Sequence, residues 1–316
     1  MSLPTFVEPL DQGLYVVDTG FHRERFDAAY LLVQDGRAAF IDTGTNFSVP
    51  RLLAALQALG LERGAVDWVI PTHVHLDHAG GVGLLMRELP AAGLLVHPRG
   101  ARHMIDPTAL YQGALAVYGQ AEMDRAYGQL IPVDADRVVS SGDGMTVELA
   151  GRALTLMDTP GHARHHHCIW DEATRGWFTG DTFGLSYREF DTAQGAWILP
   201  TSTPVQFEPE ALQHSIDRLM ERSPQAMYLT HYGRVRNVPA LAQTLKRLLA
   251  ETVGLARALK DHPRRHEALK AALHQLYTQD LARHGATFSP EEVGQLLGID
   301  IELNAQGIAV WLDRNT

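Results

Sequence analysis

The sequence contains a single cysteine, Cys168, in 316 residues. One thiol cannot form a disulfide within the chain, so we expect a reducing compartment and predict a cytoplasmic protein. No apolar run approaches the roughly 18 residues that a membrane-spanning helix needs, and the N-terminal stretch lacks the basic and apolar regions of a signal peptide. These absences predict neither a membrane span nor a secretory leader.

Basic residues are also scarce: 27 Lys and Arg stand against 37 Asp and Glu, for a formal net charge of −10 at pH 7. Proteins that bind nucleic acids usually carry a basic face. The charge balance therefore argues against a nucleic-acid partner and favours a small-molecule substrate. Hydrophobic residues at 45% and charged residues at 20% are ordinary for a globular protein. The length is large for one domain and small for two full ones.

The stretch PTHVHLDHAGG, residues 71–81, is the most distinctive in the chain. It places three histidines and one aspartate within six positions: His73, His75, Asp77 and His78. In extended chain, residues two apart point the same way, so the first two histidines can hold one cation, while the adjacent Asp77 and His78 can reach a neighbouring one. Imidazole and carboxylate groups suit zinc, iron or manganese. An apolar run before the stretch and helical spacing after it predict a strand-to-helix loop.

This pattern matches the H-x-H-x-D-H signature of the metallo-β-lactamase superfamily, which the chain resembles over about residues 12–240. The family needs three further metal-binding groups in a fixed order: a histidine, a bridging aspartate and a last histidine. The segments DTPGHARHHH, FTGD and YLTHYG supply them, each after a short apolar run. The resemblance implies two sets of ligands, with Asp181 bridging them: His73, His75 and His162 for the first ion, and Asp77, His78 and His231 for the second.

The fold that the resemblance implies is an α/β fold, a four-layer αββα sandwich with the ligand loops along one edge. Residues 14–43 predict three strands, with a hairpin turn at Asp35-Gly36 between the second and third. The apolar spacing of residues 50–60 and 208–220 predicts amphipathic helices. Residues 138–157 predict a hairpin. We assign residues 1–240 to this metallo-β-lactamase-like domain.

Two regions of the sequence are additional to the core that a minimal member of the family contains. Residues 100–131 are helix-prone and rich in Tyr and Met, and we predict an inserted helical lid over the site, with a dimer contact as the alternative. Residues 241–316 predict a mostly helical extension, with a terminal strand at 307–314. In glyoxalase II, a family relative, helices after the core help to hold a thioester substrate; a dimerisation module is the alternative, so a homodimer is possible.

Other polar residues carry weaker signals. Asp42 ends a predicted strand, and it either supports the metal loop from behind, as in the family, or caps its own turn. The run His165–His167 either contacts the ligands or is structural, and we assign none of the three as a ligand. Candidate substrate-binding residues are Tyr187, Arg188 and Arg234. The first two are polar groups of the long loop just after the bridging aspartate, and guanidinium groups suit carboxylates or phosphates, with a solvated surface pair as the alternative for Arg234 and Arg236. Lactonase relatives place a tyrosine closer to the bridging aspartate than Tyr187 is, so no role is carried over from them.

The implied activity is hydrolysis by two divalent metal ions, zinc by default with iron or manganese as alternatives. Two neighbouring cations lower the pKa of a water between them, and the resulting bridging hydroxide attacks the substrate. Asp77 and Asp181 would be the catalytic carboxylates. An apolar lid favours a small ester-like substrate, a thioester or a lactone. The alternatives are a metal-dependent phosphodiesterase or nuclease, and a sulfur dioxygenase with a single iron.

Overall fold

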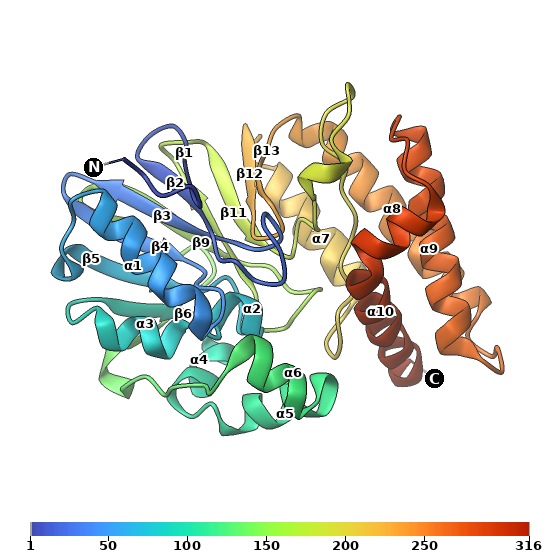
Figure 1. Ribbon diagram of the computed structural model, residues 1–316, viewed down its shortest axis with the longest axis horizontal. Coiled ribbons are helices and arrows are strands. Elements are labelled where there is room, and N and C mark those ends of the chain that lie inside the picture. Colours follow the sequence, from blue (N-terminus) through green and yellow to red (C-terminus); the bar gives the residue numbers. More distant parts are fainter. Residues whose placement is uncertain (1, 316) are drawn as a thin grey trace. The chain divides into compact units, whose positions relative to one another are not determined.

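The computed structural model describes residues 2–315, and Figure 1 shows its helices and strands. The chain forms two compact units. The first comprises the chain up to Asp158 together with His165–Gly180 and Ala226–Arg234, and the second comprises Thr159–Arg164, Asp181–Gln225 and the chain from Val235 on. The predicted division near residue 240 stays a prediction. No helix of residues 2–315 is both long and apolar enough to cross a membrane.

The first unit contains a seven-stranded sheet in which the strands follow one another in chain order. Its strands are β1 (Val7–Pro9), β2 (Leu14–Asp18), β3 (Ala28–Gln34), β4 (Arg37–Ile41), β5 (Val66–Ile70), β6 (Gly93–Val96) and β7 (Val138–Ser140). Strands β1 to β4 are antiparallel, whereas β4 to β7 are parallel. The three strands predicted over residues 14–43 are confirmed. Asp35 and Gly36 form the turn between β3 and β4, both with positive φ, as a tight hairpin requires.

Helices cover one face of this sheet (Figure 1). They are α1 (Val49–Ala58) and α3 (Val82–Glu88), with the single turns η1 (Asn46–Ser48), η2 (Arg63–Ala65) and η4 (Ala135–Arg137) between elements. Leu52 and Leu56 recur at helical spacing on α1 and pack with Phe40 of β4 in one buried core. Because β4 and β5 are held from this side, the loops after both strands start from a rigid base.

The second sheet has six strands in the order β13-β12-β11-β10-β9-β8. They are β8 (Thr146–Leu149), β9 (Arg152–Asp158), β10 (His167–Asp171), β11 (Gly176–Gly180), β12 (Ala226–Leu229) and β13 (Gly233–Val235). The hairpin predicted over residues 138–157 is wrong in its first part. Residues 138–140 pair with β6 in the other sheet, and only β8 and β9 form the hairpin. The turn residues 141–145 let the chain change sheets, which an alternating pattern does not reveal.

A buried ion pair joins two strands of the second sheet, at the start of β9 and the end of β10. Arg152, 5% exposed, and Asp171, fully buried, form two hydrogen bonds across β9 and β10, from Nε at 2.8 Å and from one terminal nitrogen at 2.5 Å. Breaking a buried pair leaves an uncompensated charge and costs about 3–5 kcal/mol. We expect Asp171→Ala to lower the free energy of unfolding by that amount in a urea titration. Asp67→Ala removes the solvent-exposed pair with Arg37 and should cost about 1 kcal/mol or less; equal losses would contradict the prediction.

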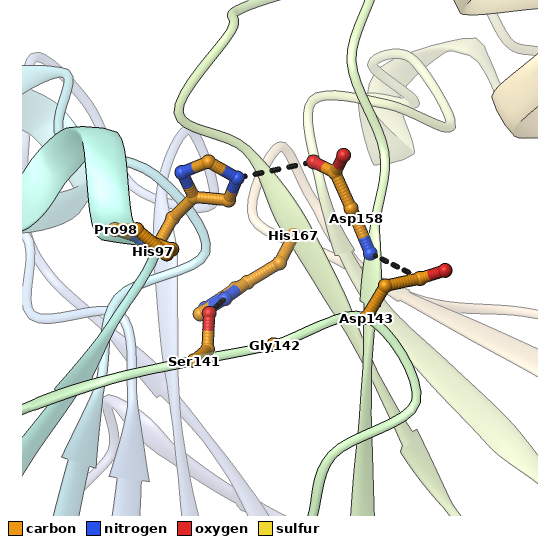
Figure 2. Close-up of a pocket in the computed structure, with 7 residues that line it drawn as sticks. All are labelled: His97, Pro98, Ser141, Gly142, Asp143, Asp158 and His167. Atoms are coloured by element: carbon orange, nitrogen blue, oxygen red, sulfur yellow. Dashed lines mark hydrogen bonds and ion pairs between the residues drawn. The ribbon is translucent and has the colours of Figure 1, made fainter.

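Two polar pairs join the sheets beside a cavity of about 160 Å³ (Figure 2). His97 after β6 contacts the Asp158 carboxylate at 3.1 Å, and Ser141 after β7 contacts Nδ1 of His167 at 2.8 Å. The Nε2–H of His167 donates to the carbonyl of Pro71 at 2.9 Å. Because burial lowers the pKa of His167 to about 3, its ring is neutral, and Nδ1 must accept from the Ser141 hydroxyl. The Ser141 hydroxyl therefore fixes the tautomer of His167 in which Nε2–H binds the Pro71 carbonyl, at the start of the loop after β5.

Removing this hydroxyl tests the junction. Ser141→Ala leaves the buried Nδ1 of His167 without its donor, which costs about 1–3 kcal/mol. We expect a lower urea midpoint for this variant, with recovery in Ser141→Thr because the hydroxyl returns and the neighbouring cavity has room for the methyl group. A matched control is Thr146→Ala, which removes an exposed hydroxyl pair with Thr155 in the same sheet. An unchanged midpoint in Ser141→Ala would refute the tautomer assignment.

The predicted insert is helical. It contains α4 (Pro98–Ile105), α5 (Thr108–Tyr118), α6 (Gln120–Glu122) and the short π-helix η3 (Met123–Tyr127). Met123 and Tyr127 are buried, and the Tyr127 ring lies 5.5 Å from that of Phe21 in the loop between β2 and β3. The insert is therefore packed against the loop between β2 and β3, within the first unit, through aromatic contacts. Its role as a lid or an interface stays a prediction.

The second unit is mostly helical. Its helices are α7 (Pro209–Met220), α8 (Val238–Ala258), α9 (Arg265–Arg283) and α10 (Pro290–Arg314), with a single turn η5 (Arg188–Phe190). The terminal strand predicted at 307–314 is wrong, because these residues continue α10. Leu297, Ile301, Ala305 and Ile308 of this helix are buried at helical spacing, so burial of one helical face outweighs the β propensity of a short apolar run.

Candidate metal centre

The loop after β5 carries four of the predicted ligands on a tightly folded backbone. His75 is the N-cap of the four-residue helix α2 (Leu76–Ala79), which contains Asp77 and His78. A Cβ on Gly80 would lie 2.3 Å from the carbonyl oxygen of Leu76, so this position requires glycine. The turn therefore presents Asp77 and His78 from one rigid helical turn, while His73 precedes it in the loop.

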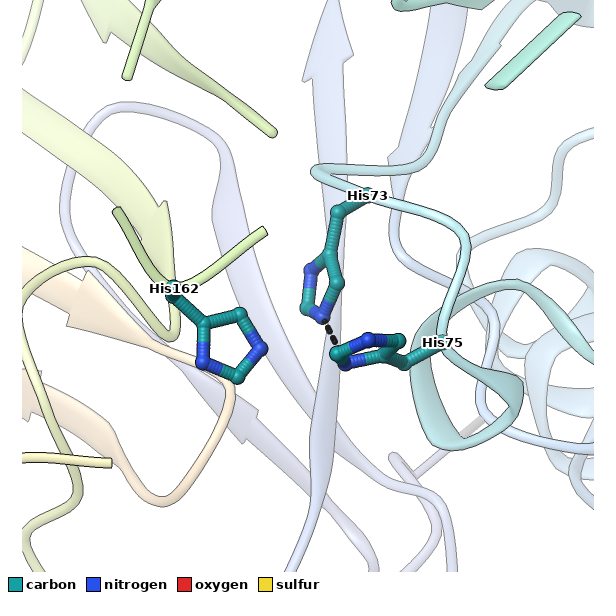
Figure 3. Close-up of side chains that lie close together, drawn as sticks. All are labelled: His73, His75 and His162. Atoms are coloured by element: carbon teal, nitrogen blue, oxygen red, sulfur yellow. Dashed lines mark hydrogen bonds between the residues drawn. The ribbon is translucent and has the colours of Figure 1, made fainter. Parts of the chain in front are cut away.

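His73 and His75 form a pair of convergent nitrogens (Figure 3). Nε2 of His73 lies 2.9 Å from Nδ1 of His75. The Thr72 hydroxyl lies 3.0 Å from the Asp42 carboxylate and 3.2 Å from Nδ1 of His73. Its one proton goes to the carboxylate, so it accepts from Nδ1 and leaves Nε2 of His73 with a lone pair. Two nitrogens on one tetrahedral zinc are about 3.3 Å apart when each bond is about 2.0–2.1 Å, and this pair is close to that separation.

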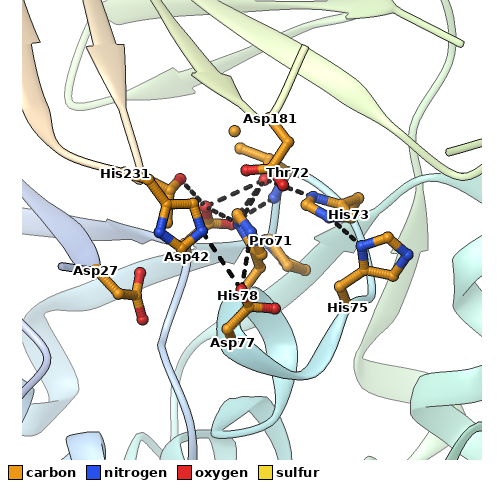
Figure 4. A network of polar contacts seen from close by, with 12 residues as sticks. Asp27, Asp42, Pro71, Thr72, His73, His75, Asp77, His78, Asp181 and His231 are labelled. Atoms are coloured by element: carbon orange, nitrogen blue, oxygen red, sulfur yellow. Dashed lines mark hydrogen bonds and ion pairs between the residues drawn. The ribbon is translucent and has the colours of Figure 1, made fainter. Parts of the chain in front are cut away.

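Asp77, His78 and His231 form a second group, with ligand atoms within 4.8 Å of one another (Figure 4). Oδ2 of Asp77 lies 3.3 Å from Nε2 of His231 and 3.7 Å from Nε2 of His78. The other nitrogen of each ring is a donor: His78 to Asp42 at 2.9 Å, and His231 to the carbonyl of Phe26 at 2.9 Å. In neutral rings both Nε2 lone pairs thus face a carboxylate oxygen, and a cation between them removes the repulsion. The group fits a divalent metal ion.

Asp42 is the centre of the network behind these ligands (Figure 4). It is fully buried and accepts from the Thr72 amide at 2.7 Å, the Thr72 hydroxyl, Nδ1 of His78 and the Thr230 hydroxyl at 2.7 Å. These donors belong to the loops that carry His73, His78 and His231. Of the two interpretations of this residue, the structure supports the first: Asp42 orients the ligands and fixes their tautomers, as carboxylates behind metal-bound histidines do.

His162 and Asp181 belong to the second unit, and Nε2 of His162 lies 3.4 Å from Oδ2 of Asp181. Chain connectivity ties both to the first unit. Asp181 directly follows Gly180, the end of β11, where a Cβ would lie 2.5 Å from the Thr72 hydroxyl. The loop that contains His162 leaves the first unit at Asp158 and returns at His165. Both side chains therefore start within a few residues of positions fixed in the first unit.

The run His165–His167 contacts the backbone and rings of the metal loop. Nδ1 of His165 accepts from the Val74 amide at 3.4 Å, and the His166 ring stacks on that of His73 at 4.8 Å. The amide of His167 donates to the Thr72 carbonyl at 2.9 Å. Burial lowers the pKa of His165 to about 2, so this ring is neutral. The three histidines hold the loop that carries His73 and His75.

The three predicted substrate contacts each have a partner within the protein. The Tyr187 hydroxyl, fully buried, donates to Asp300 at 3.0 Å. Arg188 donates to the carbonyl of Ser186 at 2.6 Å. Arg234 pairs with Asp11 at 2.8 Å. Their roles in substrate binding stay predictions.

Sequence reasoning missed one buried acid next to this centre, Asp27. Its side chain is fully buried, and burial raises its pKa to about 8. Oδ2 accepts from the Thr19 hydroxyl at 3.0 Å, while Oδ1 has no hydrogen-bond partner among the described residues. A single aspartate before a strand has no sequence signal that distinguishes it from a turn residue, so only the fold could reveal it.

A sequence model of the metallo-beta-lactamase superfamily matches residues 22–231, more than half of the chain. The chain belongs to the metallo-β-lactamase superfamily. This membership confirms the predicted fold class and the prediction of a metal-dependent hydrolase.

Relatives and solved structures agree with the assignment. A metallo-β-lactamase fold-containing protein of Sulfurisphaera tokodaii is 27% identical over 245 residues, 76% of this chain and 85% of the relative. Its solved structure has a TM-score of 0.65 at 21% identity and covers 98% of this chain and all of that one. An acyl-coenzyme A thioesterase of Gallus gallus is 28% identical over 55% of this chain and 64% of the relative. A hydroxyacylglutathione hydrolase of Salmonella typhi is 28% identical over 47% of this chain and 43% of the relative.

Proposed function

We propose that this protein is a dinuclear metal-dependent hydrolase that acts on a small ester-like substrate, a thioester or a lactone. The observation that carries the proposal is the group of Asp77, His78 and His231. Two buried imidazole lone pairs converge there on one carboxylate oxygen, and hydrogen bonds behind the rings fix both tautomers. The Nε2 lone pairs of His78 and His231 repel the Asp77 carboxylate. Protonating both rings would also remove this repulsion, but burial disfavours charged imidazolium groups. A divalent cation is the better partner.

The complete ligand set is part of the proposal, with Asp181 shared between the two ions: His73, His75 and His162 for the first, and Asp77, His78 and His231 for the second. Support for the first ion comes from the 2.9 Å approach of the His73 and His75 nitrogens. Support for Asp181 comes from its position directly after Gly180, whose backbone lies against Thr72. A carboxylate has two oxygens and can serve two ions, whereas a histidine cannot.

Two divalent ions held by these residues would supply Lewis acidity, which would lower the pKa of a bound water towards neutrality and polarise the substrate carbonyl. The residues of the chain perform the other steps. Asp77 is the most accessible ligand of its group, with a side chain 23% exposed. Its carboxylate can therefore accept a proton at Oδ1 or Oδ2 and return it to the leaving group. Asp42 keeps Nδ1 of His78 protonated, so the Nε2 lone pair remains directed at the ion.

A cluster of buried aromatic residues packed against His231 supports an acyl substrate. The Phe26 ring meets that of His231 edge-on at 5.5 Å, and Phe21 links Phe26 to Tyr127 of the insert at 6.0 and 5.5 Å. Aromatic side chains of this kind line small-molecule sites. The thioesterase and the hydroxyacylglutathione hydrolase among the relatives point to the same class of substrate.

The surroundings of the reaction are proposals of the same standing. We propose zinc as the native metal, with iron or manganese as alternatives, because the imidazole and carboxylate donors accept all three. The lone cysteine supports a reducing, cytoplasmic setting. The partner is a small molecule rather than a nucleic acid or a membrane, and a homodimer is a possible assembly.

Elemental analysis of freshly purified protein, together with a screen of thioesters, lactones and phosphodiesters, tests the proposal. We expect two zinc, iron or manganese ions per chain and hydrolysis of a thioester or a lactone. Hydrolysis of phosphodiesters alone would move the protein to the phosphodiesterase alternative. One iron per chain with oxygen consumption on a thiol-derived substrate would overturn the dinuclear hydrolase and favour the sulfur dioxygenase.

A further inference from the structure

The position of Asp27 follows from the backbone on both sides of it. The carbonyl of the preceding Phe26 accepts from Nδ1 of His231 at 2.9 Å, and the amide of the following Ala28 donates to the carbonyl of Thr230 at 2.8 Å. The Thr19 amide donates to the carbonyl of Asp27 at 3.0 Å, and the Thr19 hydroxyl lies 3.0 Å from both that carbonyl and Oδ2. Asp27 is therefore fixed against the segment that carries His231, with little freedom to move away.

The side chain of Asp27 lies on the side of the second ligand group. Figure 4 shows its carboxylate turned toward His231 and Asp77. Electrostatic interactions with His231, His78 and Asp77 all act on it. Oδ1 is buried and has no hydrogen-bond partner among residues 2–315. A buried carboxylate oxygen without a partner costs several kcal/mol, so an oxygen in this position implies a partner outside the protein.

We propose that Asp27 is a third acidic group of the second metal site, after Asp77 and the shared Asp181, and acts on the ion through one water molecule, which donates a hydrogen bond to Oδ1. Direct binding fits the geometry less well, because Asp27 is not among the residues whose ligand atoms lie within 4.8 Å of one another in the group of Asp77, His78 and His231. The proposal rests on the metal centre of the proposed function and adds to it a carboxylate that strengthens the second site and orients its water.

The charge balance explains why such a residue helps. The second ligand group contributes one carboxylate, Asp77, apart from the shared Asp181, and its two histidines are neutral. An extra negative charge held one water away raises the affinity for a divalent cation, and loss of such an outer group typically weakens metal binding about 10–100-fold. Without a cation the same carboxyl destabilises the fold, because burial raises its pKa from 3.8 to about 8, so at neutral pH folding must either protonate it or bury an uncompensated charge. Asp27 therefore has opposite effects on the metal-free and the metal-loaded protein.

Asp27→Asn tests this reversal of sign, since it removes the charge and keeps the shape. We expect the metal-free variant to have a higher Tm than metal-free wild type, and the zinc-loaded variant to have a lower Tm than zinc-loaded wild type. In a chelator-competition titration with zinc, the Kd of the second site should rise about 10–100-fold while that of the first site is unchanged. Asp27→Ser repeats the test without relying on the amide.

A matched control is Asp18→Asn. Asp18 ends β2 in the same region and is 6% exposed, but its oxygens accept from the amides of Gly20 and Arg25. This variant should lower Tm equally with and without zinc. Zinc affinities in both Asp27 variants equal to those of wild type would overturn the inference while leaving the dinuclear centre in place. Failure of wild type itself to bind two ions would instead overturn the proposed function.

Discussion

Replacing His73 and His75 together by alanine is expected to lower the metal content from two ions per chain to one and to reduce kcat/KM about 1,000-fold or more. The two side chains supply convergent nitrogens 2.9 Å apart. A Lewis-acid ion contributes several kcal/mol to transition-state stabilisation, and about 4 kcal/mol corresponds to a factor of about 1,000 in rate. Elemental analysis and steady-state kinetics on the best ester-like substrate provide the measurement.

The control for this double variant replaces His262 and His266 by alanine. His262 lies between helices α8 and α9, and His266 lies in the first turn of α9. This control removes the same number of imidazoles far along the chain from the ligand loops and should leave both metal content and kcat/KM unchanged. Circular dichroism should show a folded protein in both cases. A His73→Ala, His75→Ala protein that retains two ions would refute the ligand assignment.

The proposed ligand residues stand out in the sequence because their signal is local. His73, His75, Asp77 and His78 lie within six residues, and the loop conformation that makes them converge follows from a strand, a helix and glycines adjacent in the chain. The strands of residues 14–43 were predictable for the same reason, since alternation of burial needs no knowledge of distant partners.

The remaining features depend on partners far apart in the sequence. Tyr187 bonds to Asp300, 113 residues away, and His167 bonds to Pro71, 96 residues away. Neither contact can be recognised from the local sequence pattern. Tyr187, which was expected near the substrate, is fully buried, and His167, for which two interpretations were open, holds the loop that carries His73 and His75. The segment at 307–314 shows the same limit, because only its packing within α10 decides between strand and helix.

Asp42→Asn is expected to remove the second metal ion while preserving the fold. The Thr72 amide is a fixed donor, so the asparagine must present its oxygen at the position of Oδ1 and its NH₂ group at that of Oδ2. The NH₂ group then faces the Thr230 hydroxyl, which can accept, and Nδ1 of His78, which must give up its proton to accept. The proton of His78 moves to Nε2, the atom that would bind the ion.

This switch of the His78 tautomer distinguishes two roles of Asp42: orienting the metal-binding histidine and stabilising the fold. Asn tolerates the left-handed backbone of residue 42, where φ is 55°, so little strain is added. We expect the metal-free variant to have a Tm near that of metal-free wild type, a second-site Kd about 100-fold higher and an intact first site. Asp42→Ala, by contrast, leaves four donors without an acceptor and should destabilise the protein as well. Loss of the second ion with the first retained would indicate the tautomer switch, because loss of the Asp42 charge alone cannot explain why only one site is affected. Retention of the second ion in Asp42→Asn would mean that Asp42 does not set the tautomer of His78.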